Sequence, residues 1–311
     1  MIRGGALGDF LLTLPAMDAI RRRQPEARIT LVTRPSYGAL MHASGWVDEV
    51  RNLESAAVAA LFGPGKLPDD FRNWLSEFDE VFAWTTDADG FVAQHFIEAC
   101  LGTWYILNPK MQASGNHASA QLACGLPFEY EPFAQLHSWA PTEEFTLAIH
   151  LGSGSASKNW PVENWLKLVD RLIKEEGHPA PQNILVIAGE ADAAVTAKFI
   201  EGVTNLNCSL SGRIPIHVDK AENLPLEDLA RLLAKCRFYL GHDTGVSHLA
   251  AVCGVPSLWL FGPTNPNIWH PRTPHVHHVQ SPSSSIDQLS IETVVKELRF
   301  RFISTPTPSV P

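Results

Sequence analysis

In the second half of the chain, short apolar runs alternate with segments whose apolar residues recur at helical spacing. The expected strands are 145–151, 183–190, 237–243 and 255–263. The expected helices between and after them are 161–177, 191–201, 225–236 and 244–254. Because the strands are continuously apolar and alternate with helices, the pattern predicts a parallel sheet covered on both faces.

The first half repeats this scheme less clearly. A helix is expected over 9–23, bent at Pro15 or holding it near its first turns, and strands are expected over 27–35, 46–53 and 78–87. The stretch 103–141 is irregular, so an interdomain linker is placed near 136–145. Only three residues precede Gly4, so either the opening strand is very short or the natural chain starts earlier.

The chain after residue 263 is rich in Pro, His and Ser until about residue 285. Four of its histidines lie close together in the sequence: His270, His275, His277 and His278. Two interpretations are open, a metal site and a polar loop, and the absence of nearby carboxylates or cysteines favours the loop. A last helix is expected near 290–302, followed by a disordered tail over 304–311.

Composition narrows the class of protein. The 311 residues are 45% hydrophobic and 18% charged, which is typical of a globular protein with real cores. The formal charge of −9 argues against a nucleic-acid partner. An anionic substrate is still possible, but it must be bound by local hydrogen-bond donors, because the overall field of the protein repels it. Five dispersed cysteines indicate reduced thiols, with neither a disulfide frame nor a zinc site. No transmembrane run or secretory signal is recognised, so we expect a cytoplasmic protein.

The first segment with chemical potential is Gly4–Asp9, at the mouth of the first helix. Glycines there allow close approach of a ligand, and a helix N-terminus offers free N–H groups to an anion. The spacing is not the GxGxxG of dinucleotide sites. Asp9 is either a helix N-cap or a catalytic carboxylate, and the residues alone leave both open.

A second segment, 150–161, lies between an expected strand and helix, where open α/β sheets bind ligands. Its small residues and Lys158 suit a phosphate, but Ser157 and Asn159 break the Walker pattern. A flexible loop with a solvated lysine is the alternative.

In a third segment, 241–248, Asp243 can cap a helix whose free N–H groups face an anion. The alternative is a capped helix with a core histidine.

Together these segments resemble glycosyltransferase family 9, the ADP-heptose lipopolysaccharide heptosyltransferases. The matching pieces are ALGDFLLTLPAMDAIRR, HLGSGSASKNWPVENWLKLVDRL and FYLGHDTGVSHLAAVCGVPSLWLFGPTNP. The resemblance implies an α/β GT-B fold, with two Rossmann-like doubly wound domains facing across a cleft. We place these domains at 1–140 and 141–288, with a helix over 289–303 that packs back on the first domain and the tail after it.

The resemblance also implies roles for individual residues. Asp9 matches the family's general base, with Gly5 and Gly8 in the acceptor-side loop, and Lys158 matches the lysine that meets the donor diphosphate. The positions of the donor-binding DTGxxH segment are Asp243, Thr244, Gly245 and His248, and the expected phosphate neighbours are Ser153 and Ser155. The family implies no metal and no cofactor.

The sequence therefore predicts an inverting, metal-independent glycosyltransferase. Its expected donor is a nucleotide-diphosphate sugar, ADP-heptose above others, and its acceptor is a glycan or glycolipid such as a lipopolysaccharide core. Two alternatives stay open: a nucleotide-sugar epimerase of GT-B shape, and a non-catalytic nucleotide-sugar-binding protein. Two interpretations of the last helix stay open, packing in the fold and peripheral contact with the inner membrane. The second is suggested by Phe300 and Phe302, which alternate with Arg299 and Arg301.

Overall fold

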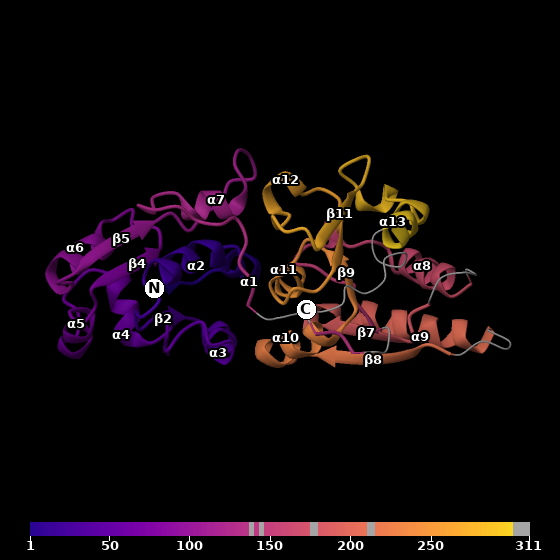
Figure 1. The fold of residues 1–311 in the computed structure, drawn as a ribbon, viewed down its shortest axis with the longest axis horizontal. Helices are drawn as coiled ribbons and strands as arrows, with labels where there is room; N and C mark the ends of the chain where they lie inside the picture. The colour runs from indigo at the N-terminus through magenta and orange to yellow at the C-terminus, as the bar shows by residue number, and fades with distance from the viewer. Residues whose placement is uncertain (137–139, 143–145, 175–179, 210–214, 301–311) are drawn as a thin grey trace. The chain divides into compact units, whose positions relative to one another are not determined.

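The computed structural model describes residues 1–136, 140–142, 146–174, 180–209 and 215–300. The chain divides into two units, Met1–Leu136 and His137–Pro311, each with its own parallel sheet (Figure 1). The division falls at the start of the expected linker, 136–145. The tail expected over 304–311, and residues 301–303 of the last expected helix, lie outside the described residues.

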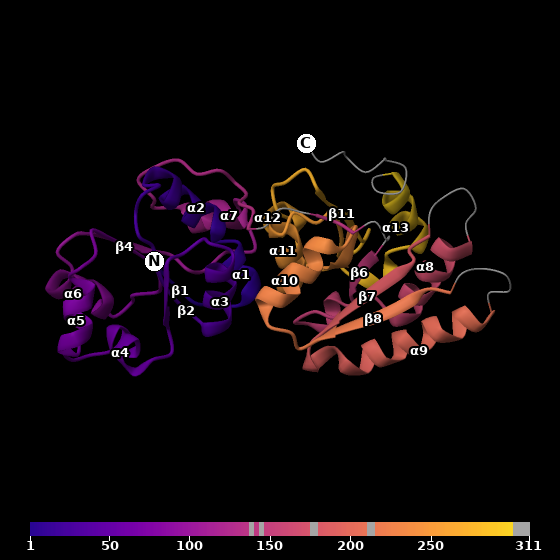
Figure 2. The same cartoon turned by 60° about the horizontal axis from the view of Figure 1, so that its bottom comes forward.

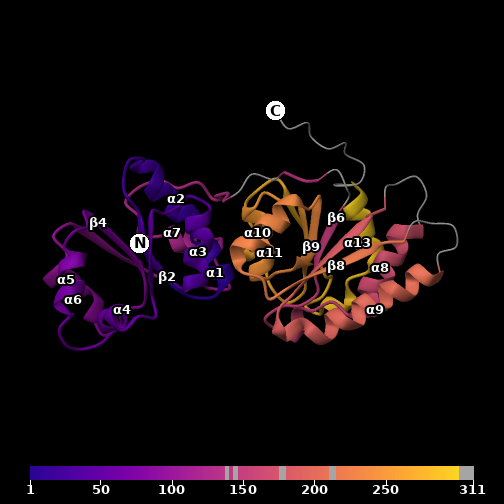
Figure 3. The same cartoon turned by 90° about the horizontal axis from the view of Figure 1, so that it is seen from below.

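The first unit is built on a five-stranded parallel sheet in the order β3-β2-β1-β4-β5. Its strands are β1 (Ile2–Arg3), β2 (Thr30–Thr33), β3 (Glu49–Asn52), β4 (Glu80–Trp84) and β5 (Thr103–Leu107). Its α-helices are α1 (Leu7–Leu11), α2 (Leu14–Arg23), α3 (Pro35–Ala43), α4 (Ala56–Ala59), α5 (Asp69–Leu75), α6 (Phe91–Ala99) and α7 (Ala118–Ala123). In Figure 3, α1, α2, α3 and α7 cover one face of this sheet, and α4, α5 and α6 cover the other.

The second unit has six parallel strands in the order β11-β10-β9-β6-β7-β8. They are β6 (Thr146–His150), β7 (Asn183–Ala188), β8 (His217–Glu222), β9 (Phe238–His242), β10 (Ser257–Phe261) and β11 (Val276–Gln280). The α-helices are α8 (Val162–Lys174), α9 (Ala193–Ser209), α10 (Leu226–Lys235), α11 (Gly245–Val252), α12 (Pro266–Trp269) and α13 (Ile291–Leu298). Figures 2 and 3 show α8, α9 and α13 on one face, with α10 and α11 on the other.

The strand order of the second unit is that of a Rossmann fold, and the first unit has the same order without a sixth strand. Each unit has its own apolar core. In the second, Trp165, Leu168 and Leu172 of α8 lie among the apolar side chains of β6, β7 and β9. The α/β class and the alternation of strands and helices predicted from the sequence are therefore confirmed.

Several elements differ from the sequence predictions. The helix expected over 9–23 is two helices, and Pro15 is the second residue of α2, where its missing N–H leaves no hydrogen bond unmade. The stretch 103–141, predicted to be irregular, contains β5 and α7. The histidine-rich segment is not a continuous loop, because His277 and His278 lie on β11, the edge strand in which Val276 and Val279 are buried.

We expected a last helix over 289–303 to pack back on the first domain, and that expectation stays a prediction. Within its own unit, the last described helix, α13, packs against α8 and β11. Val294, Val295 and Leu298 are buried in that unit's core, since their helical spacing gives α13 one apolar face. The Trp160 indole N–H also donates to the carbonyl of Leu289, just before this helix.

Every helix within the described residues is too short or too polar to serve as a membrane span.

Candidate active site

The two central strands of the second sheet, β6 and β9, lie side by side, and the chain leaves them toward opposite edges. In open parallel sheets, ligands bind at such a switch point, beyond the carboxyl ends of the strands. The segments that follow β6 and β9 are 151–161 and 243–245. Both are candidate segments from the sequence, and they meet at this point.

The contact between them is an ion pair. The Lys158 Nζ lies 3.0 Å from Asp243 Oδ2 and 3.4 Å from the Asp243 main-chain oxygen. Lys158 ends the short 3₁₀ helix Ala156–Lys158, and its side chain keeps 27% of its exposure. The cation is therefore ion-paired at the switch point and still faces solvent, whereas the alternative interpretation expected a solvated lysine.

Asp243 is a buried carboxylate, with 8% of its surface exposed. Burial acts to raise its pKa, but the imidazole of His248 and the ammonium of Lys158 outweigh burial and lower the pKa to about 2. The His248 Nε2 lies 3.8 Å from Asp243 Oδ1, and its ring meets Trp259 edge-on. Asp243 is thus a fixed negative charge that orients two neighbouring side chains.

Thr244, and not Asp243, caps helix α11. Its hydroxyl oxygen accepts a hydrogen bond from the Ser247 N–H at 3.2 Å. We expected Asp243 in this place, but its carboxylate is engaged by Lys158 and His248. The cap leaves the N–H groups of Gly245 and Val246 in the first turn without intrahelical partners. These two amides and the helix dipole favour an anion beside Lys158.

Behind the cap lies a chain of hydrogen bonds. The Thr244 hydroxyl is 3.3 Å from His150 Nδ1, and His150 Nε2 is 3.2 Å from Asp192 Oδ2. The hydrogen bond from His150 lowers the pKa of Asp192 against the effect of burial. A side chain at Gly152 would overlap the Asp192 carboxylate, so glycine is required where this loop crosses Asp192.

The two serines expected near a phosphate bond inside the loop. The Ser153 hydroxyl lies 2.7 Å from the Ser155 carbonyl oxygen and 2.6 Å from Asn159 Oδ1. The Ser155 hydroxyl lies 2.9 Å from that of Ser157. Their side chains therefore shape the segment that carries Lys158.

In the first unit, Asp9 lies in the first turn of α1 at the carboxyl edge of the sheet. Ala6 occupies the N-cap position, so the interpretation of Asp9 as an N-cap is wrong. The main-chain oxygen of Asp9 accepts from Arg3 Nη2 at 3.1 Å and from the Thr13 hydroxyl at 2.8 Å. Among the described residues, none donates a hydrogen bond to the Asp9 carboxylate, so its backbone is held while its side chain is available.

Arg3 holds this loop from below. It is 2% exposed, and it also donates from Nε to Thr13 and from Nη1 to the carbonyl of Pro109. Burial lowers the pKa of Arg3, and the Asp9 charge opposes that shift. Gly5 has φ of +95°, a conformation that favours glycine, and its carbonyl accepts from the Tyr37 hydroxyl. Gly8 precedes Asp9 within α1.

The histidines after residue 263 have structural partners. His275 Nε2 lies 3.0 Å from the Ala251 carbonyl oxygen, and the rings of His270 and His278 lie 4.7 Å apart beside Phe261. Burial lowers the pKa of His270 to about 3. In the described ranges, no cluster of three or more His, Cys, Asp or Glu side chains is arranged to hold a metal ion.

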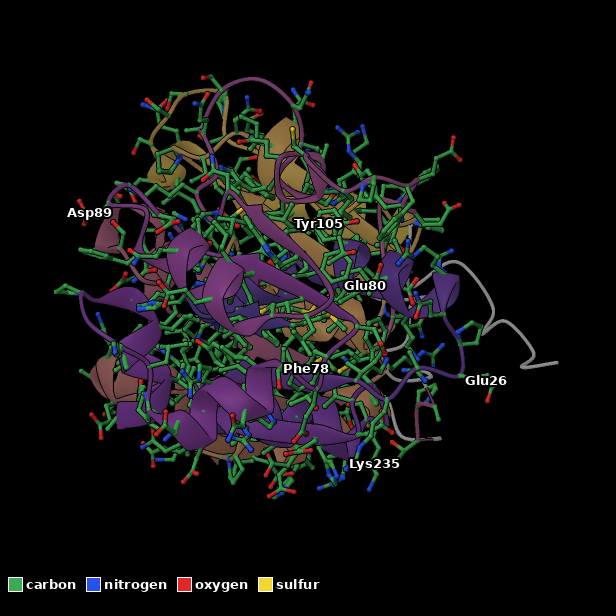
Figure 4. The ribbon with its side chains drawn as sticks, turned by 90° about the vertical axis from the view of Figure 1, so that its left-hand side faces the viewer. Glu26, Phe78, Glu80, Asp89, Tyr105 and Lys235 are labelled. Atoms are coloured by element: carbon green, nitrogen blue, oxygen red, sulfur yellow. The ribbon has the colours of Figure 1, made fainter. Side chains whose placement is uncertain are left out.

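A cavity of about 640 Å³ lies at the amino ends of β1 to β4, the opposite edge of the first sheet from Asp9. Glu26, Phe78 and Glu80, labelled in Figure 4, belong to its lining. No candidate residue from the sequence lines it, so it is separate from the candidate site.

The structure brings together five of the predicted residues in the second unit: Lys158, Asp243, Thr244, Gly245 and His248. In the first unit, Gly5 lies just before α1, and Gly8 and Asp9 lie in its first turn. No role was predicted from the sequence for Arg3, Asp192 or His242. The only signal for the last two was position: Asp192 comes just after one expected strand, and His242 lies near the end of another. No local sequence pattern predicts a buried arginine such as Arg3.

Comparison with known proteins adds a family. The model of glycosyltransferase family 9 (heptosyltransferase) matches residues 110–298, more than half of the chain. Lipopolysaccharide heptosyltransferase 1 of Salmonella typhimurium is 30% identical over 129 residues, and that of Pseudomonas aeruginosa is 32% identical over 135 residues. Each match covers 42% of this chain, but only 35% and 32% of the two relatives.

Solved structures show the same fold over nearly the whole chain. Escherichia coli heptosyltransferase WaaC with ADP has a TM-score of 0.69 at 19% identity, covering 96% of this chain and 98% of its own. The E. coli ADP-heptose lipopolysaccharide heptosyltransferase II has a TM-score of 0.69 at 16% identity, covering 97% of each chain. Both likenesses indicate a GT-B fold of two Rossmann-like units, as the sequence predicted. With this fold and the match of the family model, the chain belongs to glycosyltransferase family 9, the heptosyltransferase family.

Proposed function

We propose that this protein is an inverting glycosyltransferase that transfers heptose from ADP-heptose to a glycan or lipopolysaccharide-core acceptor. The observation that carries the proposal is the site at the β6–β9 switch point. There, Lys158 and the first-turn amides of α11 converge beside the buried carboxylate of Asp243. One cation and a set of free amides suit the diphosphate of a nucleotide sugar.

In the proposed reaction, an acceptor hydroxyl attacks the anomeric carbon from the face opposite the diphosphate. The new carbon–oxygen bond forms as the bond to the diphosphate breaks, and ADP leaves with the bonding electrons. Asp9 takes the proton of the acceptor hydroxyl, for which a carboxylate that accepts no hydrogen bond from the described residues is suited. Lys158 and the α11 amides stabilise the negative charge on the departing ADP.

Metal independence is part of this proposal, because Lys158 and the helix amides supply the positive charge that the leaving group needs. The choice of ADP-heptose is supported by the family and by the two E. coli structures, one solved with ADP and one named for ADP-heptose. Asp9 lies outside the matched range 110–298, so its role is carried by its position in the first unit and by the resemblance of its loop.

The first test is a thermal-shift panel of ADP, UDP, GDP and TDP, followed by incubation with ADP-heptose and defined acceptors. We expect ADP to raise Tm most, through preferential binding to the folded state. Mass spectrometry should then detect an acceptor enlarged by one heptose. Release of altered free sugar would favour an epimerase, and ADP binding without any turnover would favour a non-catalytic binding protein. Either outcome contradicts the proposal.

We also propose peripheral contact with an anionic membrane surface. A cavity of about 680 Å³ between α8 and α13 has four basic lining residues and two acidic ones, and Phe300, which also lines it, is 72% exposed. The basic residues are Lys167, Arg171, Lys296 and Arg299, and the acidic ones are Asp170 and Glu292. This cationic surface contrasts with the net charge of −9. Cosedimentation with vesicles of anionic lipid should fall in Lys167→Glu/Lys296→Glu. Equal binding of this variant and the parent protein would contradict the contact.

A further inference from the structure

The segment that carries Lys158 is held at both ends by a single imidazole. His242 is the last residue of β9 and is fully buried. The Trp160 N–H donates to His242 Nε2 at 2.8 Å, and His242 Nδ1 lies 3.4 Å from the Gly152 carbonyl oxygen. Gly152 and Trp160 bracket the segment, and Lys158 lies between them.

These two partners determine where the proton of the ring sits. A backbone N–H can only donate, so Nε2 must be the unprotonated nitrogen, and Nδ1 then carries hydrogen toward a carbonyl that can only accept. Burial lowers the pKa of His242 to about 3. Around the ring, His150 and Lys158 also lower this pKa, whereas Asp192 and the hydrogen bond to Gly152 raise it, and burial is the largest effect. The ring is therefore neutral at the pH of any ordinary assay.

The neighbouring residue completes the arrangement. His242 binds the two ends of the segment, and Asp243, next in the chain, binds the ammonium of Lys158. The end of β9 thus fixes both the path of the loop and the position of its cation. Edge-on contact with Trp165 keeps the imidazole plane in place from the side of α8.

We propose that His242 is a positioning residue, whose neutral Nδ1–H imidazole holds the 152–160 segment so that Lys158 meets the donor diphosphate. This inference rests on the proposed function, and it deepens it. A histidine at the end of a site strand invites a role as acid or base. Here both ring nitrogens are hydrogen-bonded to backbone groups, so the ring does not transfer a proton.

The loop itself is tested first, without substrate. In His242→Ala, the Trp160 amide should exchange its hydrogen about tenfold to a hundredfold faster, because it loses its acceptor. His242→Asn offers an acceptor and a donor on one side chain and should restore most of the protection. His95→Asn is the matched control: its ring is equally buried in the first unit and lies 3.0 and 2.8 Å from two backbone carbonyls, of Leu61 and Gly65. It should leave Trp160 exchange unchanged.

Nitrogen NMR of the parent protein supplies a readout that does not depend on any variant folding. The His242 ring should remain in the Nδ1–H form from about pH 5 to pH 9. An Nε2–H ring, titration within that range, or unchanged Trp160 exchange in His242→Ala would each overturn the inference.

Activity measurements then test whether the hydrogen bonds of His242 to Trp160 and Gly152 affect binding of the donor. His242→Ala should raise the KM for ADP-heptose about tenfold or more, with a smaller change in kcat, and His242→Asn should recover most of the loss with an unaltered pH profile. Loss of kcat alone, or a pH profile changed in His242→Asn, would contradict positioning. If the parent protein shows neither ADP binding nor transfer, the proposed function fails. The exchange and NMR results still test whether His242 holds the 152–160 segment through Trp160 and Gly152.

Discussion

Lys158 and Asp243, 85 residues apart in the sequence, form an ion pair of 3.0 Å at the point where β6 and β9 release the chain toward opposite edges of the second sheet. The pair joins two segments that were separate candidates in the sequence. It also gives the carboxylate of Asp243 a role beside the site that we propose for a diphosphate. Asp243 positions the ammonium of Lys158, while the first-turn amides of α11 have no intrahelical partners.

Replacing Lys158 by Met should weaken ADP binding about tenfold to a hundredfold, because a charge-assisted hydrogen bond to the diphosphate is lost. Calorimetric titration with ADP measures the change. Lys174→Met is the matched control, since Lys174 lies on the adjoining α8 and pairs with Asp170 in solvent. Equal ADP affinity in Lys158→Met and the parent protein would remove Lys158 from the donor site.

Asp243 should make the free energy of unfolding depend on pH in the acidic range. Its pKa falls from an ordinary value near 4 to about 2 in the folded protein, so the folded state favours the charged form. Its contribution is therefore complete above about pH 4 and is lost as the pH falls toward 2. By linkage this amounts to roughly 2 kcal/mol.

Denaturant unfolding of the parent protein and Asp243→Asn, repeated between pH 6 and pH 2, measures this effect. The difference between them should shrink as the pH falls below 4. Asp219→Asn removes an exposed carboxylate that pairs with His217 on β8 and serves as control. A difference that stays constant down to pH 2 is incompatible with a charged, paired Asp243.

Gly152→Ala should destabilise the fold by more than about 1 kcal/mol, because its methyl group would overlap the Asp192 carboxylate held by His150. Gly154→Ala, two residues on, places its methyl group in open space and should cost far less. Chemical unfolding of both variants, and of Asp192→Ala alone and with Gly152→Ala, forms a double-mutant cycle. Strict additivity in that cycle would show that the two residues do not press on each other.

The fold class was predictable because its signals are local. Continuous apolar runs such as that of β6 and the helical spacing of Trp165, Leu168 and Leu172 need no partner to be recognised. Edge strands gave weaker signals. The polar β8, and β11 with its two histidines, bury only part of their residues, so their sequences look like loops.

The candidate site was predictable to the level of segments, and the hydrogen bonds were not. Lys158 and Asp243 stood out by residue type and place, yet which group caps α11 depended on whether Lys158 reached Asp243. His242 and Asp192 act through backbone atoms of other segments, and Arg3 through the main chain of Asp9. Contacts of this kind are made by tertiary packing and leave no periodic trace.

Asp9 is proposed as the base of heptosyl transfer. The most direct test of this role compares Asp9→Asn with the parent protein in single-turnover reactions with ADP-heptose and a lipopolysaccharide-core acceptor. Asparagine keeps the size of the side chain and the main-chain bonds from Arg3 and Thr13. We expect ADP affinity within about twofold of the parent and transfer slowed at least about a hundredfold, the scale of general-base catalysis. Transfer by Asp9→Asn at the parental rate would contradict the account.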